Sequence, residues 1–402
     1  MKLNYYKNLI RVLAVWTFIL GADSLRGENL FFNESPDRVT KNGGGRILSF
    51  GKDKLMVTYS NKIIILEIGE KGKFKIIQQL HRINFNDAIL YDVNKDGFID
   101  IIFAGYTTSI SGGERMKKGV GGIFYGSKNG FDSEAELFEA SDKVYGYSVT
   151  VGDINGDGVK DIIFSIRKGG LVVFSGKNVI RSIFDKPLLI DNSILAGSYI
   201  IAADFDNDKS DEIAVARFSK KHSIHKYDKT TKQLKQVWES AKKGQSPTFL
   251  CTADLNKDGR PDLIQGGVGY ARNSKVQIFL SGKQTYFNTK ADYGFTPAKD
   301  EYVDRVVDII VTDLNKDGNP DLIVGTAGQA KNADFGGKIF FLLNQGDGKF
   351  SVGQKIKKSG SELTLLDVNG DAKKDLLASN ILHHILKRIK IDPRNLYIHY
   401  AK

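Results

Sequence analysis

The sequence predicts an all-β fold, a seven-bladed β-propeller closed by pairing of its N- and C-terminal strands. Three observations predict it: an acidic motif that occurs six times at an average spacing of 55 residues, several short β-like runs in each interval, and Gly-rich turns between these runs. Four short strands in about 50 residues is the size of one propeller blade. A two-sheet sandwich is the alternative, but it gives no reason for equal periods.

The N-terminal segment has the three parts of a secretory signal peptide. Basic residues precede an apolar run at 12–22, and small or polar residues follow it. The run has 11 residues, whereas a membrane-spanning helix needs about 20; a buried N-terminal helix is the alternative. We therefore expect a signal peptide at 1–24 and a mature propeller at 25–402. The protein is predicted to be exported, as a periplasmic, cell-surface or secreted protein without a transmembrane segment.

The first blade is predicted at 46–80, because this segment has four β-like runs and no acidic loop. The six acidic units then bring the count to seven. The last unit is short of strands, and pairing of the segment 29–33 (NLFFN) into it would complete the ring and remove an exposed edge. The single cysteine, Cys251, lies in a strand-like run and is expected to be a small buried apolar residue; one cysteine excludes a disulfide framework.

Each acidic motif places carboxylate or amide oxygens at positions 1, 3, 5 and 9 of a short loop, where alternate side chains can turn toward one centre. Position 7 adds its backbone carbonyl. Six to eight oxygen ligands suit Ca²⁺ rather than Mg²⁺ or Zn²⁺, so the sequence predicts up to six calcium ions. The predicted ligands are Asp92, Asn94, Asp96, Phe98 and Asp100 in the first loop; Asp153, Asn155, Asp157, Val159 and Asp161 in the second; Asp204, Asp206, Asp208, Ser210 and Glu212 in the third; Asp254, Asn256, Asp258, Arg260 and Asp262 in the fourth; Asp313, Asn315, Asp317, Asn319 and Asp321 in the fifth; and Asp367, Asn369, Asp371, Lys373 and Asp375 in the sixth.

These loops differ from EF-hands, because position 12 is never the bidentate Glu and the flanks are strand-like. Without a cation, clustered carboxylates repel one another, so six ion-free copies are not expected. Position 6 is expected to need positive φ, and it is Gly in four loops. Lys209 and Ala372 take this position in the third and sixth loops, at a cost of roughly 1 kcal/mol each. The third loop has a fourth carboxylate, so the sixth is expected to bind weakest.

The chain resembles the FG-GAP/VCBS repeat family, the calcium-binding propeller repeats also found in integrin α-chain heads. The D-x-[ND]-x-D-G-x-x-D loops carry the resemblance, together with the hairpin N-x-G-D-G-x-F at 344–350 and partial matches to the FG and GAP signatures. The resemblance runs from about residue 46 to the end of the chain. It implies a calcium-stabilised propeller used for recognition or adhesion, and it implies no particular chemistry.

The partner-binding surface is expected at the end of the sheets opposite the acidic loops, where the other connections are rich in Lys and Arg. The chain carries 58 Lys and Arg against 47 Asp and Glu, and 19 of these acids lie in the loops. A positive surface favours an anionic glycan or protein partner, whereas a specific nucleic-acid role is not predicted. The candidate ligand-binding residues are Arg115, Lys117, Lys118, Lys220, Lys221 and Arg272.

No catalytic motif accompanies the repeats: G-x-S-x-G, H-E-x-x-H and a P-loop are all missing from the sequence. Most paired acids fall inside the loops, where they are candidate ligands. The pair His383–His384 lies among apolar residues with helical spacing and favours packing over catalysis. The predicted function is a non-enzymatic binding or adhesion module. The alternatives are a structural subunit of an envelope complex and a secreted polysaccharide-degrading enzyme built on the same scaffold.

Overall fold

The computed structural model describes residues 37–40, 46–59, 62–69, 73–81, 83–111, 114–118, 120–138, 146–166, 169–176, 189–195, 199–217, 220–241, 246–268, 275–282, 286–296, 303–328, 337–359, 361–379, 396–399 and 401. The long regular elements in these ranges are all β-strands, as the sequence predicts. Within the same ranges no helix has the length and apolar character needed to span a membrane. The predicted signal peptide, the segment 29–33, and the pair His383–His384 lie outside the described residues.

The N-terminal half forms four antiparallel sheets. The first contains β2 (Ile47–Phe50), β3 (Lys54–Tyr59), β4 (Lys62–Gly69) and β5 (Lys73–His81). The second contains β6 (Ile83–Tyr91), β7 (Asp100–Ser111), β9 (Gly121–Phe124) and β12 (Glu136–Phe138), with β8 (Glu114–Lys118) also paired to β7 and a separate hairpin of β10 (Gly126–Ser127) and β11 (Gly130–Phe131). The third contains β13 (Gly146–Gly152), β14 (Asp161–Ile166), β15 (Gly169–Phe174) and β16 (Leu189–Leu195), and the fourth β17 (Tyr199–Ala203), β18 (Glu212–Ala216), β19 (Ser223–Asp228) and β20 (Gln233–Glu239).

The C-terminal half forms one eight-stranded sheet and three strands of a four-stranded sheet. The fifth sheet contains β21 (Ser246–Ala253), β22 (Asp262–Val268), β23 (Val276–Phe279), β24 (Tyr293–Phe295), β25 (Val303–Thr312), β26 (Asp321–Gly328), β27 (Gly337–Asn344) and β28 (Phe350–Ser359). The sixth contains β29 (Glu362–Leu366), β30 (Asp375–Ser379), β31 (Leu396–His399) and β1 (Asp37–Thr40). In this last sheet β1 pairs antiparallel with β31, so strands from the two ends of the chain lie side by side.

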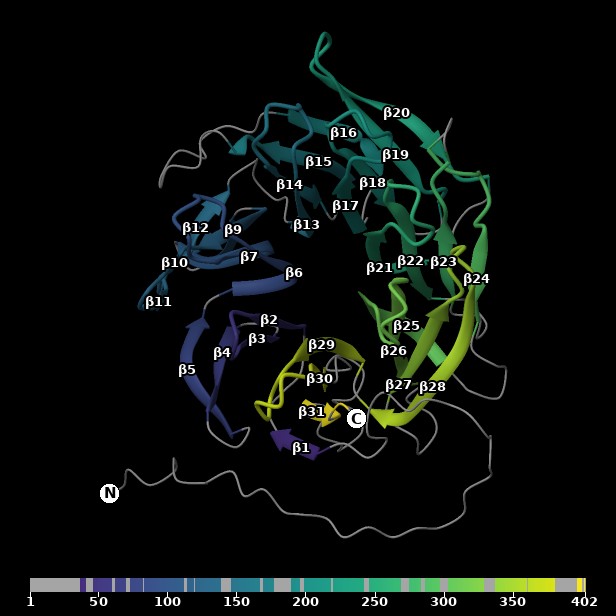
Figure 1. Cartoon of the computed structure of the whole chain (residues 1–402). Coiled ribbons are helices and arrows are strands. Elements are labelled where there is room, and N and C mark those ends of the chain that lie inside the picture. The colour runs from purple at the N-terminus through teal and green to yellow at the C-terminus, as the bar shows by residue number, and fades with distance from the viewer. Residues whose placement is uncertain are drawn as a thin grey trace.

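The sheets are arranged around a common centre, and the first strand of each four-stranded unit lies innermost (Figure 1). The chain is therefore an all-β β-propeller. The described residues form six sheets of four or more strands, so the prediction of seven separate blades is wrong. The cause is a single pairing, Val268 in β22 with Arg305 in β25, which joins two successive four-stranded units into one eight-stranded sheet.

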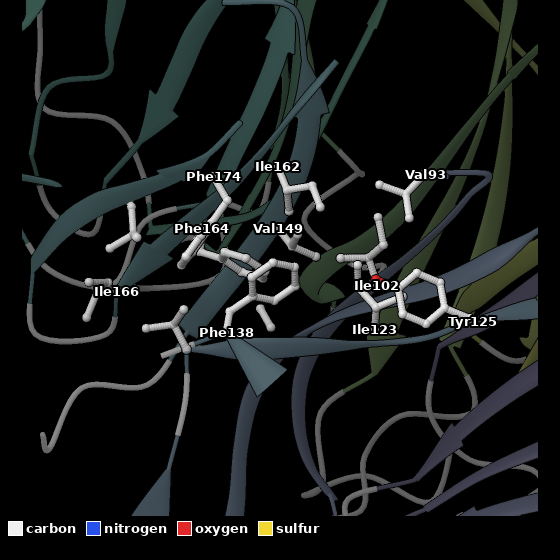
Figure 2. Packing of buried hydrophobic residues seen from close by; sticks show 13 residues of the cluster. Val93, Ile102, Ile123, Tyr125, Phe138, Val149, Ile162, Phe164, Ile166 and Phe174 are labelled. Carbon is white, nitrogen blue, oxygen red and sulfur yellow. The ribbon is translucent and has the colours of Figure 1, made fainter. Parts of the chain in front are cut away.

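Hydrophobic clusters between neighbouring sheets hold the arrangement together. The second strand of each unit is buried on both faces, which is why it reads as a continuous apolar run such as DIIF: Ile101, Ile102 and Phe103 are all fully buried. Figure 2 shows the cluster between the second and third sheets. There the Phe138 ring centroid lies 5.1 Å from that of Phe164 and 4.7 Å from that of Phe174.

Candidate metal centres

Each acidic loop connects the first strand of a four-stranded unit to its second strand, as the sequence predicts. The first loop joins β6 to β7, and the others follow β13, β17, β21, β25 and β29 in the same way. Because the strands are antiparallel, every loop lies at the end of its sheet where the innermost strand finishes. The connections from second to third strand lie at the other end.

In each loop the backbone wraps around the carboxylate at position 1. In the first loop Asp92 Oδ1 accepts a hydrogen bond from the Asp96 amide (3.2 Å), and its Oδ2 accepts one from the Gly97 amide (2.9 Å). The Asp96 carboxylate in turn accepts from the Phe98 amide (2.9 Å). The other five loops repeat all three bonds. The predicted ligands at positions 1 and 5 are therefore held in place by the loop's own backbone.

Two residues of every loop have left-handed backbone conformations. At position 6, Gly97, Gly158, Gly259 and Gly318 have φ between 82° and 89°, as predicted. Lys209 and Ala372 also have positive φ, of 73° and 65°. Position 4 is left-handed too, which the sequence analysis missed; the residues there are Lys95, Gly156, Asn207, Lys257, Lys316 and Gly370.

The acid at position 9 is buried and cross-links the strands of its own unit. Asp100 is fully buried; its Oδ2 accepts from the Val93 amide and its Oδ1 from the Gly126 amide, both at 2.8 Å. A Cβ on Gly126 would lie 2.1 Å from the Ile99 carbonyl oxygen, so only glycine fits there. Burial raises the pKa of Asp100 to about 6. A bound cation would lower this pKa by favouring the carboxylate.

An apolar residue at position 2 anchors each loop in the core. Its side chain packs between sheets while its backbone amide donates to the position 9 acid, for example Leu255 to Asp262 Oδ2 at 2.7 Å. The sequence analysis missed this function, although every copy has an apolar residue there. These residues are Val93, Ile154, Phe205, Leu255, Leu314 and Val368.

In the second loop, one observation shows directly that the oxygen atoms suit a hard cation. Asn155 Oδ1, a predicted ligand at position 3, is buried and accepts no hydrogen bond from the described residues. A cation beside it would satisfy this oxygen. In the first, fourth, fifth and sixth loops the position 3 amide nitrogen donates to the position 5 carboxylate, as Asn94 does to Asp96 (2.9 Å), so these two side chains converge. The residues present therefore suit calcium, which would be held by side-chain oxygens and the position 7 carbonyl.

The third loop differs because a lysine lies among its acids. Asp204, Asp206 and Asp208 bring carboxylate oxygens within 4.8 Å of one another. The Lys226 ammonium lies 2.7 Å from Asp208 Oδ2 and 2.9 Å from Glu212 Oε1, and it also pairs with Asp206 Oδ2. Partial burial disfavours the charged ammonium, but hydrogen bonds to these three acids raise the pKa of Lys226 above its ordinary value.

The predicted ligand-binding residues are distributed over three connections. Arg115, Lys117 and Lys118 lie on β8, which pairs with the extended end of β7, so this connection is a β-ribbon. Lys220 and Lys221 lie between β18 and β19. Lys220 is exposed, whereas Lys221 Nζ pairs with Glu239 Oε2 at 2.7 Å. Arg272 lies outside the described residues.

A polar cluster at the innermost strands is a third feature that was not predicted from the sequence. Asp87 in β6 pairs with Arg46 and accepts from Ser148 Oγ (2.8 Å) in β13. Asp308 in β25 accepts from the Leu363 amide (2.8 Å) in β29. These carboxylates thus link the innermost strands of adjacent units. The signal was present: both acids lie five residues before the first acid of their loops.

Burial and nearby like charges shape this central cluster. The Glu362 side chain in β29 is buried and interacts electrostatically with Asp308, Arg46 and Asp87. Burial and the Asp308 carboxylate raise the pKa of Glu362 well above its ordinary value, against the opposing effect of Arg46. Burial also raises the pKa of Asp308. Three carboxyl groups thus share one guanidinium.

The fold and the loops define a class of protein, the β-propellers built from repeats that each carry one acidic loop. The model of the FG-GAP-like repeat matches residues 92–164, 199–265 and 313–378. The chain belongs to this family. Each matched region begins at or just before the loop of one unit, so the repeat is the unit that the sequence spacing indicates.

Curated relatives match about a third of the chain. Human phosphatidylinositol-glycan-specific phospholipase D is 29% identical over 151 residues, which are 32% of this chain and 18% of the relative. The rat enzyme of the same name is 28% identical over 154 residues, or 33% of this chain and 18% of the relative. The matched part thus spans less than a fifth of these relatives.

A solved structure matches the whole fold. BBS1N, in a crystal structure of its complex with ARL6DN, superposes with a TM-score of 0.55 and covers 92% of this chain and 97% of its own. The sequence identity is 12%, so this likeness shows the fold alone.

Proposed function

We propose that the chain is an exported, calcium-stabilised β-propeller that binds an anionic glycan or protein partner through the end opposite the acidic loops. The observation that carries this proposal is the repeated loop geometry. Six loops hold the carboxylates of positions 1 and 5 with the same three backbone hydrogen bonds, at the same end of each unit. Loops that are built alike and face one end leave the other end free for recognition.

We infer that the ring is closed by contacts between the first and last sheets. The β1–β31 pairing supports this, as does the hydrogen bond between Thr364 Oγ1 in β29 and Ser49 Oγ in β2 (3.0 Å). A hydrophobic cluster spans the same junction and includes Ile47 and Leu377. A closed ring leaves only the short outer edges of its sheets unpaired and fixes the connections of the far end relative to one another.

The charge of the far end supports an anionic partner. The β7–β8 ribbon and the β18–β19 connection both carry consecutive basic residues. A group of charges of one sign attracts polyanions over distances of about a Debye length. Both connections would therefore contribute to the attraction of an anionic partner. The similarity to phosphatidylinositol-glycan-specific phospholipase D favours a phosphate-bearing glycan among such partners.

Retention on immobilised heparin, an anionic polysaccharide, tests this proposal. Charge reversal to Glu at Lys117, Lys118, Lys220 and Lys221 is expected to abolish retention in calcium buffer. The matched control reverses Lys52, Lys73, Lys75 and Lys128, which are exposed at the loop end. The control changes the net charge equally and is expected to stay bound. Equal loss of retention in both variants would contradict a defined binding end.

Before retention is compared, thermal melts establish whether both variants are folded. This check matters because reversing Lys221 places a second acid beside Glu239. A structural role in an envelope complex is distinguished by pull-down from envelope extract with calcium and with chelator. A stable stoichiometric complex that resists high salt would favour that alternative.

A further inference from the structure

The third loop contains its own cation. Lys226 projects from β19 into the group of acids that the sequence assigns to a metal ion, and its ammonium contacts the acids of positions 3, 5 and 9. The ammonium hydrogen-bonds Asp206 Oδ2 and lies within ion-pair distance of the other two acids. Nζ lies 2.7 Å from Asp208 Oδ2 and 2.9 Å from Glu212 Oε1. These are the oxygens that would surround a calcium ion in this loop.

The lysine is specific to this unit. Strand pairing fixes its register, because His225 lies opposite Ile213 in the second strand of the unit. The same register in the other five units identifies the residues that take the place of Lys226. They are Tyr125, Ser175, Leu280, Leu343 and Tyr400. None of these five is basic, so at this position of the sequence the third unit alone carries a lysine.

The position 9 acid is adapted to the lysine. In the other loops an aspartate uses its two oxygens for two backbone amides, for example Asp262 for the amides of Leu255 and Ser281. Glu212 is one methylene longer. Its Oε2 accepts from the Phe205 amide (2.9 Å), and its Oε1 faces Lys226. The longer Glu212 side chain therefore lets one oxygen keep the backbone hydrogen bond while the other faces Lys226.

Asp206, which pairs with the lysine, also joins two sheets. Asp206 Oδ2 accepts a hydrogen bond from the Tyr286 hydroxyl (2.7 Å), and Tyr286 precedes β24 in the next sheet. The neighbouring rings of Phe205 and Phe287 pack edge to face, with centroids 5.4 Å apart. Asp206 Oδ1 accepts no hydrogen bond from the described residues, so Asp206 contributes through Oδ2 alone. The third loop, β19 and the segment before β24 thus meet at Asp206.

We propose that the Lys226 ammonium takes the place of the metal ion in the third loop, so that this loop binds no divalent cation. The proposal rests on the proposed function for the other five loops. Calcium needs oxygens at about 2.3–2.6 Å and cannot share them with an ammonium at hydrogen-bond distance. The chain then binds at most five ions, and the junction between the fourth and fifth sheets holds without calcium.

Native mass spectrometry in millimolar calcium counts the bound ions of the full chain. Lys226→Met keeps the length of the side chain and removes its charge, and it is expected to bind one ion more than the unmodified protein. Lys75→Met, an exposed lysine on β5 of the first sheet, which has no acidic loop, is the matched control and is expected to leave the count unchanged. An unchanged count in folded Lys226→Met would overturn the proposal.

A second pair of variants keeps the test valid if Lys226→Met does not fold. Asp206→Asn combined with Asp208→Asn in the third loop is expected to lose no ion. Asp254→Asn combined with Asp258→Asn in the fourth loop is expected to lose one. Loss of an ion from the third-loop variant would refute the proposed role of Lys226 and would leave the proposed calcium sites of the other loops standing. A count of zero in the unmodified protein would refute the proposed calcium sites and this inference with them.

Discussion

At the scale of single residues, the backbone conformation at position 6 of the loops does not depend on which side chain is present. The position is left-handed in all six loops, whether glycine is present or not. Ala372 has φ of 65° and Gly318 has φ of 82° at equivalent places. The turn is therefore imposed by the hydrogen bonds of the position 1 acid, and the residue at position 6 adapts to it.

Replacement of Ala372 by glycine is expected to stabilise the protein. A left-handed non-glycine residue costs roughly 1–2 kcal/mol. Glycine recovers this but adds conformational entropy to the unfolded chain, at about 0.4–1 kcal/mol. The net gain should be about 0.5–1 kcal/mol in the free energy of unfolding, measured by denaturant titration in calcium. The reciprocal control Gly318→Ala should lose a similar amount. A loss in both variants would show that position 6 of the sixth loop is not strained.

The sequence indicated which residues line the loops but could not show what lies opposite them. Positions 1, 3, 5 and 9 are separated by a few residues, so their approach follows from local spacing. Lys226 is 14 residues beyond Glu212 and reaches it only because β18 and β19 pair in one register. The contact of Tyr286 with Asp206 depends on the packing of one sheet on the next. Such contacts are properties of tertiary structure.

At the scale of strands, apolar runs predicted the elements well. The four runs expected in 46–80 coincide with β2 to β5. The connection after β7 is rich in Gly, Ser and Thr. It extends the strand into a ribbon, since Thr and Ser also suit an exposed β-ladder. The merging of two units through one pair, Val268 with Arg305, has no signature in local sequence.

The innermost strands carry a polar cluster whose protonation affects stability. Burial raises the folded-state pKa of Asp308 and of Glu362 above the ordinary values of 3.8 and 4.5. The folded state then holds more protons than the unfolded state, so the free energy of unfolding falls as the pH rises. The stabilisation from these two acids is fully present below about pH 4 and is lost as the pH rises through the folded-state pKa values.

Glu362→Gln removes this penalty and nearly keeps the shape of the side chain. Its melting temperature is expected to exceed that of the unmodified protein at pH 7, and the difference should disappear near pH 4, where Glu362 is protonated in both states. Arg46, Asp87 and Asp308 remain in place and keep their own contributions. The exposed Glu134→Gln is the control and should give no pH-dependent difference. A constant offset at every pH would mean that packing, and not charge, produces the effect.

At the scale of the whole molecule, the loops and the basic connections have different tasks. The acids at positions 1 and 5 are half-buried or exposed at one end, whereas the acids at position 9 are buried as cross-links between strands. A cation at a loop would therefore join the half-buried or exposed part of each turn to the buried part of the unit. Because adjacent units share hydrophobic clusters, an ion in one loop stabilises its neighbours as well.

Removal of calcium is therefore expected to lower the stability of the entire ring. Extracellular loops of this kind bind calcium at about 10⁻⁴–10⁻³ M. At 10 mM calcium, a site with a dissociation constant of about 1 mM adds about 1.4 kcal/mol, and five independent sites add about 7 kcal/mol. Melting temperatures in calcium should therefore exceed those in excess chelator by many degrees. Magnesium at equal ionic strength should restore little, because it prefers smaller octahedral sites. Identical melting temperatures in calcium, magnesium and chelator would refute the proposed metal centres, because ions that bind only the folded state must stabilise it.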